Sequence, residues 1–129
     1  MIALDASVLI AHLDHTDAHH GAASRLLDEV ATEPLIAHGL TIAEVLVGGV
    51  RLNRGAEMRT DLEDIGVRLA TPDDDEPLRL AGFRVATGFG PPACCVLDVA
   101  VKQEAALATF DDGLASAARR LNVRLVPSR

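Results

Sequence analysis

The sequence is poor in aromatic residues, because its 129 residues include three Phe, no Trp and no Tyr. A core must therefore be built from Leu, Val, Ile and Ala. It also lacks any apolar run close to the ~20 residues of a membrane-spanning helix. The N-terminal segment has no basic region followed by an apolar stretch and a cleavage site, so no secretory signal is expected. These absences predict a cytoplasmic protein without membrane attachment.

Cysteine and positive charge are scarce as well. Cys94 and Cys95, the only two cysteines, are adjacent, so they lack the spacing of a zinc site and could pair only in a strained ring. Reduced thiols are expected.

The formal net charge of −7 argues against nucleic-acid binding through a general positive field. It is still compatible with a nuclease whose acidic residues gather in one metal pocket.

Short apolar runs alternate with helical patterns along the whole chain, without repeats or long linkers. The patterns predict strands at 1–4, 35–37, 67–70, 107–109 and 123–126. They predict helices at 7–13, 19–31, 57–65, 73–87, 93–104 and 113–121, and one more that Thr41 caps together with Glu44. This alternation predicts a single α/β domain over residues 1–129 with a mostly parallel sheet.

Acidic residues follow two of the predicted strands. Asp5 interrupts the apolar opening MIALDASVLI, and Asp111 follows the strand at 107–109. Glu44 lies in the first turn of the helix after the strand at 35–37. Ligands bind beyond the carboxyl ends of parallel strands. We therefore expect Asp5, Glu44 and Asp111 to converge at one edge of the sheet.

Three converging carboxylates would raise one another's pKa values unless a cation neutralised them. Oxygen ligands in an open site suit Mg²⁺ or Mn²⁺, and such a site favours hydrolysis of phosphodiesters. Structural alternatives are open for each residue. Asp5 and Asp111 could be helix caps, and Glu44 could be the capping-box partner of Thr41.

Three further residues are candidates for supporting contacts around such a site. Ser7 could orient the Asp5 carboxylate by hydrogen bonding, and Thr109 could orient Asp111 in the same way. Asp112 is a candidate for an outer contact to the metal through water. A response-type domain with an acidic phosphoacceptor is a weaker alternative, since no lysine follows the last acidic strand.

Three segments, MIALDASVLIAHLD, LTIAEVLVG and ALATFDDGLASAARRLNVRLVP, resemble the PIN-domain ribonucleases, and especially VapC-type toxins of bacterial toxin–antitoxin pairs. The resemblance implies a PIN-like three-layer sandwich with four to five strands flanked by helices. It implies a Mg²⁺-dependent endoribonuclease acting on RNA of the tRNA or rRNA class, with a VapB-type antitoxin as partner and a homodimeric state. It assigns the catalytic, metal-holding roles to Asp5, Glu44 and Asp111.

One acid of the family's pattern is missing. Relatives read like Pro-Asp-Cys-Cys-Val-Leu, whereas PPACCVLDVA places Ala93 at that position. Asp98 is the nearest substitute, but five helical residues rotate it by ~140° and move it ~7.5 Å along the axis. It would then point away from the pocket unless the helix starts later, and could instead be a charge on a wetter face, paired with Lys102.

Ala93 therefore predicts weak Mg²⁺ binding and slow RNA cleavage, whether it is natural or introduced. The alternative function is a catalytically weakened PIN fold that acts mainly as an antitoxin- or RNA-binding module. His12, His15, His19 and His20 cluster near the N-terminus, and we expect them to be exposed histidines rather than a zinc site.

Overall fold

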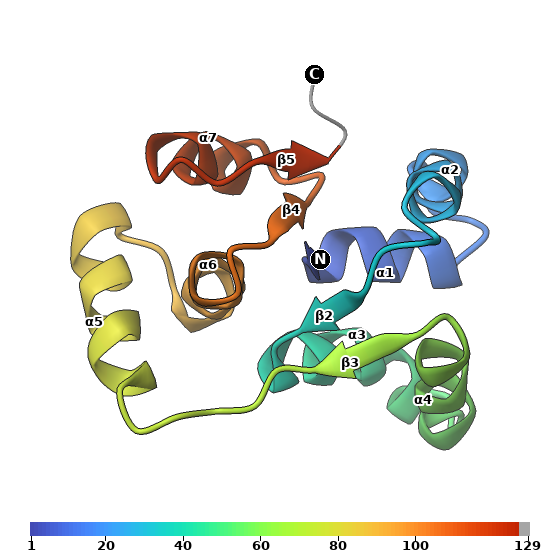
Figure 1. Cartoon of the computed structure of the whole chain (residues 1–129). Coiled ribbons are helices and arrows are strands. Elements are labelled where there is room, and N and C mark those ends of the chain that lie inside the picture. The colour runs from blue at the N-terminus through green and yellow to red at the C-terminus, as the bar shows by residue number, and fades with distance from the viewer. Residues whose placement is uncertain (127–129) are drawn as a thin grey trace.

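The computed structural model describes residues 1–126, so the last three residues of the expected domain, 127–129, lie outside the described residues. The strands are β1 Ile2–Leu4, β2 Leu35–Ala37, β3 Val67–Leu69, β4 Ala106–Ala108 and β5 Leu125–Val126 (Figure 1). The helices are α1 Ala6–Leu13, α2 His20–Glu29, α3 Gly39–Arg51, α4 Gly55–Asp64, α5 Glu76–Thr87, α6 Pro91–Lys102 and α7 Asp112–Arg120. Their order agrees with the sequence prediction, although several ends differ by two or three residues.

The five strands form one sheet in the order β3-β2-β1-β4-β5, and every pairing between neighbours is parallel. β1 lies in the centre, where Ile2 is opposite both Leu35 of β2 and Ala106 of β4. The predicted α/β fold with a mostly parallel sheet is confirmed. The carboxyl ends of β2, β1 and β4 lie side by side, which is the edge where the sequence placed its acidic residues.

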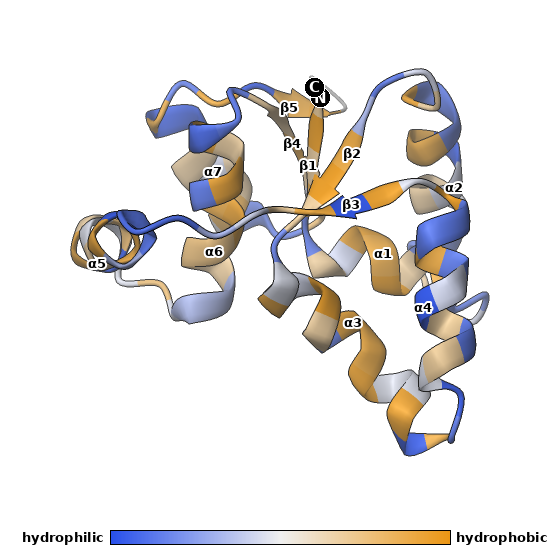
Figure 2. Cartoon of the chain, turned by 60° about the horizontal axis from the view of Figure 1, so that its bottom comes forward, coloured by the Kyte–Doolittle hydropathy of each residue, from blue (hydrophilic) through white to orange (hydrophobic). Residues whose placement is uncertain are grey.

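Helices cover both faces of the sheet, and the alternation of side chains along β1 shows why. Ile2 and Leu4 point into one core with α1, α2, α3 and α4, whereas Ala3 points into a second core with α6 and α7. Both faces of the central strands are buried, so these strands are hydrophobic throughout (Figure 2). The result is a three-layer sandwich.

α5 lies outside these layers and packs against α6 (Figure 1). None of its residues is fully buried, although Phe83 packs against the second core. Within residues 1–126, no single helix is long and apolar enough to cross a membrane. Only α5 and α6 taken together have the length and composition of a membrane span, and the two helices are bent by 113° at the break between them.

The start of α3 differs from the prediction. His38, not Thr41, is the N-cap, because its Nδ1 accepts the N–H of Leu40 at 3.0 Å directly after β2. Thr41 therefore lies inside the helix, where it is completely buried and its Oγ1 has no hydrogen-bond partner among the described residues. The predicted capping box between Thr41 and Glu44 is wrong, since the N-cap lies three residues earlier, at His38.

Candidate active site

Asp5 lies at the carboxyl end of the central strand and is held by three hydrogen-bond donors. Its Oδ1 accepts the N–H of Ala6 at 2.8 Å, which caps α1. Its Oδ2 accepts the hydroxyls of Ser7 at 2.9 Å and Thr109 at 2.6 Å. The helix cap and an oriented carboxylate are therefore one arrangement, and the first does not exclude the second.

Thr109 links the ends of β1 and β4. Leu4 is opposite Ala108 in the register of these strands, so the residues that follow, Asp5 and Thr109, leave the sheet next to each other. The sequence suggested that Thr109 orients the carboxylate of Asp111. Its hydroxyl instead donates to Asp5 and accepts the backbone N–H of Asp111 at 3.0 Å. The Ser7 contact to Asp5 is the one that the sequence suggested.

Glu44 is exposed on α3 and lines a groove of about 490 Å³ together with Ile10 and Leu13 of α1. Partial burial, and then the negative charge of Asp5, raise the pKa of Glu44 above its ordinary value. Within residues 1–126, neither carboxylate forms a salt bridge. The charge of Asp5 thus disfavours ionisation of Glu44, and no salt bridge recorded among the described residues offsets that repulsion.

Asp111 lies at the same edge, two residues after Thr109. Its Oδ1 accepts the N–H of Leu114 at 2.9 Å and so caps α7, and its side chain is exposed. Asp112 is exposed in the first turn of α7. Asp111, like Asp5, therefore caps a helix and also lies at the carboxyl edge of the sheet.

Asp98 is only 3% exposed, which corrects the expectation of a charge on a wet helix face. Arg79 of α5 holds both of its oxygens, with Nε at 2.6 Å from Oδ1 and a terminal nitrogen at 3.1 Å from Oδ2. Lys102 pairs with Asp73 instead of Asp98. The ion pair with Arg79 would have to break before Asp98 could bind a metal.

Ala93 lies in the first turn of α6, half-buried, and packs against the second core. α6 begins at Pro91, two residues earlier than predicted, so it offers no later start that would turn Asp98 toward the position of Ala93. The first turn of α6 therefore contributes no carboxylate to the edge.

The carboxylates fit a hard divalent cation in part. Asp5 and Glu44 offer oxygen ligands, and their mutual repulsion is what such a cation would relieve. However, no group of three or more His, Cys, Asp or Glu side chains within residues 1–126 has the spacing to hold a metal ion. Asp5 and Glu44 are thus near enough to influence each other electrostatically, and among residues 1–126 no third side chain, Asp111 included, completes a metal-binding group with them.

The sequence prediction missed a contact between His38 and Glu76 at the same edge. Because His38 Nδ1 accepts the N–H of Leu40, its Nε2 is the donor to Glu76 Oε1 at 2.5 Å. Both ring nitrogens are engaged, which ties the start of α3 to the start of α5. The sequence did contain a sign of this contact. His38 directly follows the predicted strand at 35–37 and precedes the helix that carries Glu44, so it lies at the same edge as the acidic residues.

The buried thiol of Cys95 lies beside these acidic residues. Burial, followed by the negative charges of Glu76 and Asp98, raises the pKa of Cys95 to about 11. Cys94 is also buried and donates to the carbonyl of Phe89 at 3.4 Å. Both cysteines are free, and protonation makes Cys95 a poor nucleophile and a poor metal ligand at neutral pH.

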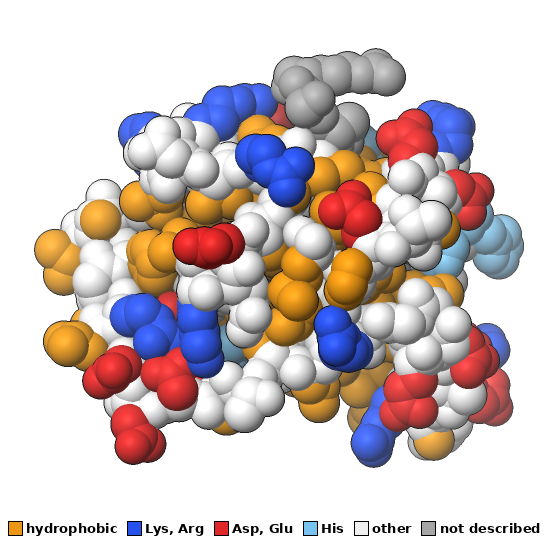
Figure 3. All heavy atoms as spheres, viewed as in Figure 1, with side chains coloured by type: hydrophobic (Ala, Val, Ile, Leu, Met, Phe, Trp, Pro, Cys, Tyr) orange, Lys and Arg blue, Asp and Glu red, His pale blue; other side chains and the backbone are white. Residues whose placement is uncertain are grey.

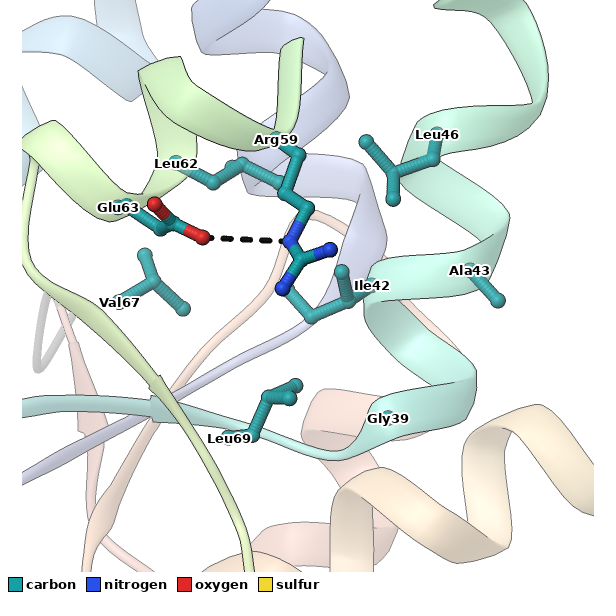
Figure 4. A pocket seen from close by; sticks show the side chains of 9 residues that line it. All are labelled: Gly39, Ile42, Ala43, Leu46, Arg59, Leu62, Glu63, Val67 and Leu69. Carbon is teal, nitrogen blue, oxygen red and sulfur yellow. Dashed lines mark hydrogen bonds and ion pairs between the residues drawn. The ribbon is translucent and has the colours of Figure 1, made fainter. Parts of the chain in front are cut away.

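A second pocket, of about 400 Å³, lies between α3, α4 and β3 (Figure 4). Its wall is mostly apolar, with Ile42, Leu46 and Leu62 among the side chains that line it. The charged pair in it, Arg59 with Glu63 at 3.2 Å, is internally neutral. The pocket contains none of the predicted site residues, so it is not the candidate active site.

The charged side chains do not form a basic surface on the face drawn in Figure 3. Lys and Arg are scattered there among Asp and Glu, with hydrophobic side chains between them. This mixture agrees with the net charge of −7. Any nucleic acid that approaches this face would be held by local contacts rather than by a general positive field.

Comparisons with known proteins agree with this fold. VapC20 of Mycobacterium tuberculosis, described as a sarcin-ricin loop cleaving toxin, matches with a TM-score of 0.74 and 19% identity, over 91% of this chain and 95% of its own. PAE2754 from Pyrobaculum aerophilum matches with a TM-score of 0.58 and 22% identity, over 89% and 82%. No curated protein matches the sequence. The PIN domain family model matches residues 2–120, and this chain therefore belongs to the PIN domain family.

Proposed function

We propose that this chain is a VapC-type toxin, a divalent-metal-dependent endoribonuclease weakened by the alanine at position 93. Its membership of the PIN domain family and its structural likeness to VapC20 support a nuclease. Asp5, Glu44 and Asp111 would hold the metal, with Ser7 and Thr109 orienting Asp5, and Asp111 would have to move closer to the other two than it lies in this structure. Asp112 is an outer contact, and Asp98 is a ligand only if Arg79 releases it.

The observation that carries this proposal is the electrostatic repulsion between the carboxylates of Asp5 and Glu44, which contributes to the raised pKa of Glu44. Asp5 caps α1, but no hydrogen bond or salt bridge among the described residues requires a second carboxylate, Glu44 of α3, near enough for the charge of Asp5 to help raise its pKa. A bound Mg²⁺ or Mn²⁺ supplies positive charge that offsets both groups and the charge developing on a cleaved phosphodiester. Ser7 and Thr109 fix the Asp5 carboxylate in one orientation, which lowers the entropy lost when a ligand binds it.

A catalytically weakened PIN fold, acting mainly as an antitoxin- or RNA-binding module, is the second candidate. Ala93 favours it, because the first turn of α6 supplies no carboxylate and the described residues contain no three-ligand group. In this case Asp5 and Glu44 remain from an active nuclease and bind metal too weakly for turnover.

Partners and location follow from the VapC-type assignment. We propose an RNA substrate of the tRNA or rRNA class, a cognate VapB-type antitoxin, a homodimer and a cytoplasmic location. Val47 and Val50 of α3 are 44% and 64% exposed, so their apolar side chains are available for a protein contact.

Thermal unfolding with Mg²⁺ or Mn²⁺ tests the metal site. We expect a small rise in the midpoint for this chain and a larger rise for Ala93→Asp, which restores the missing carboxylate. A metal at tenfold its dissociation constant would stabilise the fold by ~1.4 kcal/mol. The matched control combines Ala93→Asp with Asp5→Asn, and should lose the added rise if the metal binds at the sheet edge.

Cleavage of total RNA by this chain and by Ala93→Asp separates the two candidates. Faster cleavage by Ala93→Asp, abolished by EDTA, supports a nuclease impaired at this position. Equal activity of the two proteins in Mg²⁺ refutes the role given to Ala93. RNA cleavage by neither protein, with no metal-dependent change in the midpoint of this chain, favours the binding module.

A further inference from the structure

Phe110 lies within the candidate active site rather than in the centre of a core. It stands between Thr109, whose hydroxyl binds the Asp5 carboxylate, and Asp111. Its backbone N–H donates to Ser7 Oγ at 3.0 Å, and the same hydroxyl donates to Asp5 at 2.9 Å. The ring of Phe110 is only partly buried against the first core. Its position beside Asp5 is therefore fixed through the backbone.

His19 lies flat against this ring. The two ring centroids are 4.9 Å apart and the ring planes differ by 21°, which is a stacked arrangement. The backbone of His19 is held at the start of α2, since its N–H donates to Asp17 Oδ1 at 2.8 Å and its carbonyl accepts the N–H of Ala23 at 2.8 Å. His19 is exposed, and within residues 1–126 neither of its ring nitrogens forms a hydrogen bond.

The other two phenylalanines have a different environment. Phe83 and Phe89 both pack against the second core, on the opposite face of the sheet. In a chain without Trp or Tyr, the phenylalanine next to the acidic edge is thus Phe110, and its ring is stacked with that of His19. His19 of that pair is exposed, and its ring nitrogens have no hydrogen-bond partner within residues 1–126.

We propose that His19 and Phe110 form a stacking site for an unpaired base of the RNA substrate, next to the carboxylate of Asp5. This inference rests on the proposed function and names the kind of RNA that the site accepts. A base that enters would extend the stack on the exposed side of His19, while the free ring nitrogens of His19 remain available to its polar edge.

The chemistry of the surface favours an unpaired base over a duplex. In a helix both faces of each base are already covered, whereas a base in a loop or single strand can stack on a protein ring. The net charge of −7 and the acidic edge weaken contacts to phosphates, so a contact that does not depend on charge gains importance. RNA with an unpaired base near the cleaved bond is the expected ligand class.

Binding of RNA that contains 2-aminopurine tests the site without any cleavage, because EDTA is present throughout. The chain has no Trp or Tyr, so the probe dominates the fluorescence. Two RNAs of equal length are compared, one with the probe in a hairpin loop and one with the probe in a duplex. We expect this chain to bind the loop RNA more tightly and to quench its probe.

Variants assign the effect to the ring pair. His19→Ala should weaken binding of the loop RNA by roughly tenfold and remove the quenching, since stacking supplies about that factor per base. His19→Phe should retain quenching, because a flat ring is kept. Phe110→Leu should also lose affinity, whereas Phe83→Leu, which removes a ring from the other core, should bind as the unaltered chain does.

The outcomes separate this inference from the proposed function. If the unaltered chain binds the loop RNA and His19→Ala binds and quenches equally well, the stacking site is refuted while an RNA-binding function stands. Equal affinity for the loop and duplex RNAs also overturns it. Failure of the unaltered chain to bind either RNA in EDTA overturns the stacking site alone, because the proposed nuclease requires a divalent metal and is tested separately by cleavage of total RNA in Mg²⁺. His19→Ala changes an exposed side chain, and its thermal unfolding midpoint checks that the fold is intact.

Discussion

At the scale of single residues, Glu44 is a site where stability and binding oppose each other. Its pKa in the folded protein is raised above the ordinary 4.5 by burial and by Asp5. As pH rises past 4.5 the unfolded chain loses this proton first, so stability falls until Glu44 ionises in the folded state as well. The loss then persists at neutral pH, in the absence of a bound cation.

Glu44→Gln should therefore stabilise the metal-free protein at about pH 7, by less than ~1 kcal/mol because the side chain is exposed and screened. Near about pH 3 the variant and the unaltered chain should be equally stable, since Glu44 is then protonated in both states. Urea unfolding at the two pH values measures the difference. A variant that is less stable at neutral pH would contradict the repulsion between Asp5 and Glu44.

At the scale of elements, polar contacts contribute strongly to the attachment of α5. Arg79 bridges the buried Asp98 of α6 and the half-buried Asp73, and Glu76 binds His38. Arg79, and then Lys102, hold the pKa of Asp73 well below its usual range. The contribution of Asp73 to stability is therefore present above its ordinary pKa and is lost only as pH falls through the lower folded value.

Arg79→Met should destabilise the protein, because it leaves the buried carboxylate of Asp98 without a cation. Adding Asp98→Leu should recover part of that loss, since the double variant buries no unpaired charge. Arg54→Met is the matched control in the exposed pair of Arg54 and Glu57, and should stay within about 0.5 kcal/mol. Denaturant unfolding compares them. A double variant less stable than Arg79→Met would show that the charge of Asp98 is balanced in another way.

At the scale of the whole molecule, one thin sheet separates two hydrophobic cores. Leu9 belongs to the first core and Leu97 to the second, and both are completely buried. Each Leu→Ala change should cost about 2–5 kcal/mol, and the two losses should add because the residues belong to different cores. Both variants should still unfold in a single calorimetric transition, since the three-residue strands β1 and β4 contribute side chains to both cores. Two separate transitions would disprove one cooperative domain.

Predictability differed between the fold and the candidate site. Strands as short as Leu35–Ala37 were predictable because a parallel strand covered on both faces must be apolar throughout. The starts of helices were less predictable. His38 is the N-cap of α3 in place of the expected Thr41, and α5 begins three residues later than predicted. Several polar residues near each of these starts can act as caps, and only the path of the chain leaving β2 or β3 selects one of them.

The sequence by itself determined the α/β order, the placing of Asp5 directly after one buried strand and the placing of Asp111 three residues after the end of another, because period and strand ends are local properties of the chain. Tertiary structure alone decided which groups meet: Thr109 with Asp5 rather than Asp111, Asp98 with Arg79 rather than Lys102, and His19 with Phe110. Each of these pairs joins segments that are far apart in sequence, and their contact depends on strand register and helix rotation in the packed molecule. No local pattern of residues encodes those two quantities.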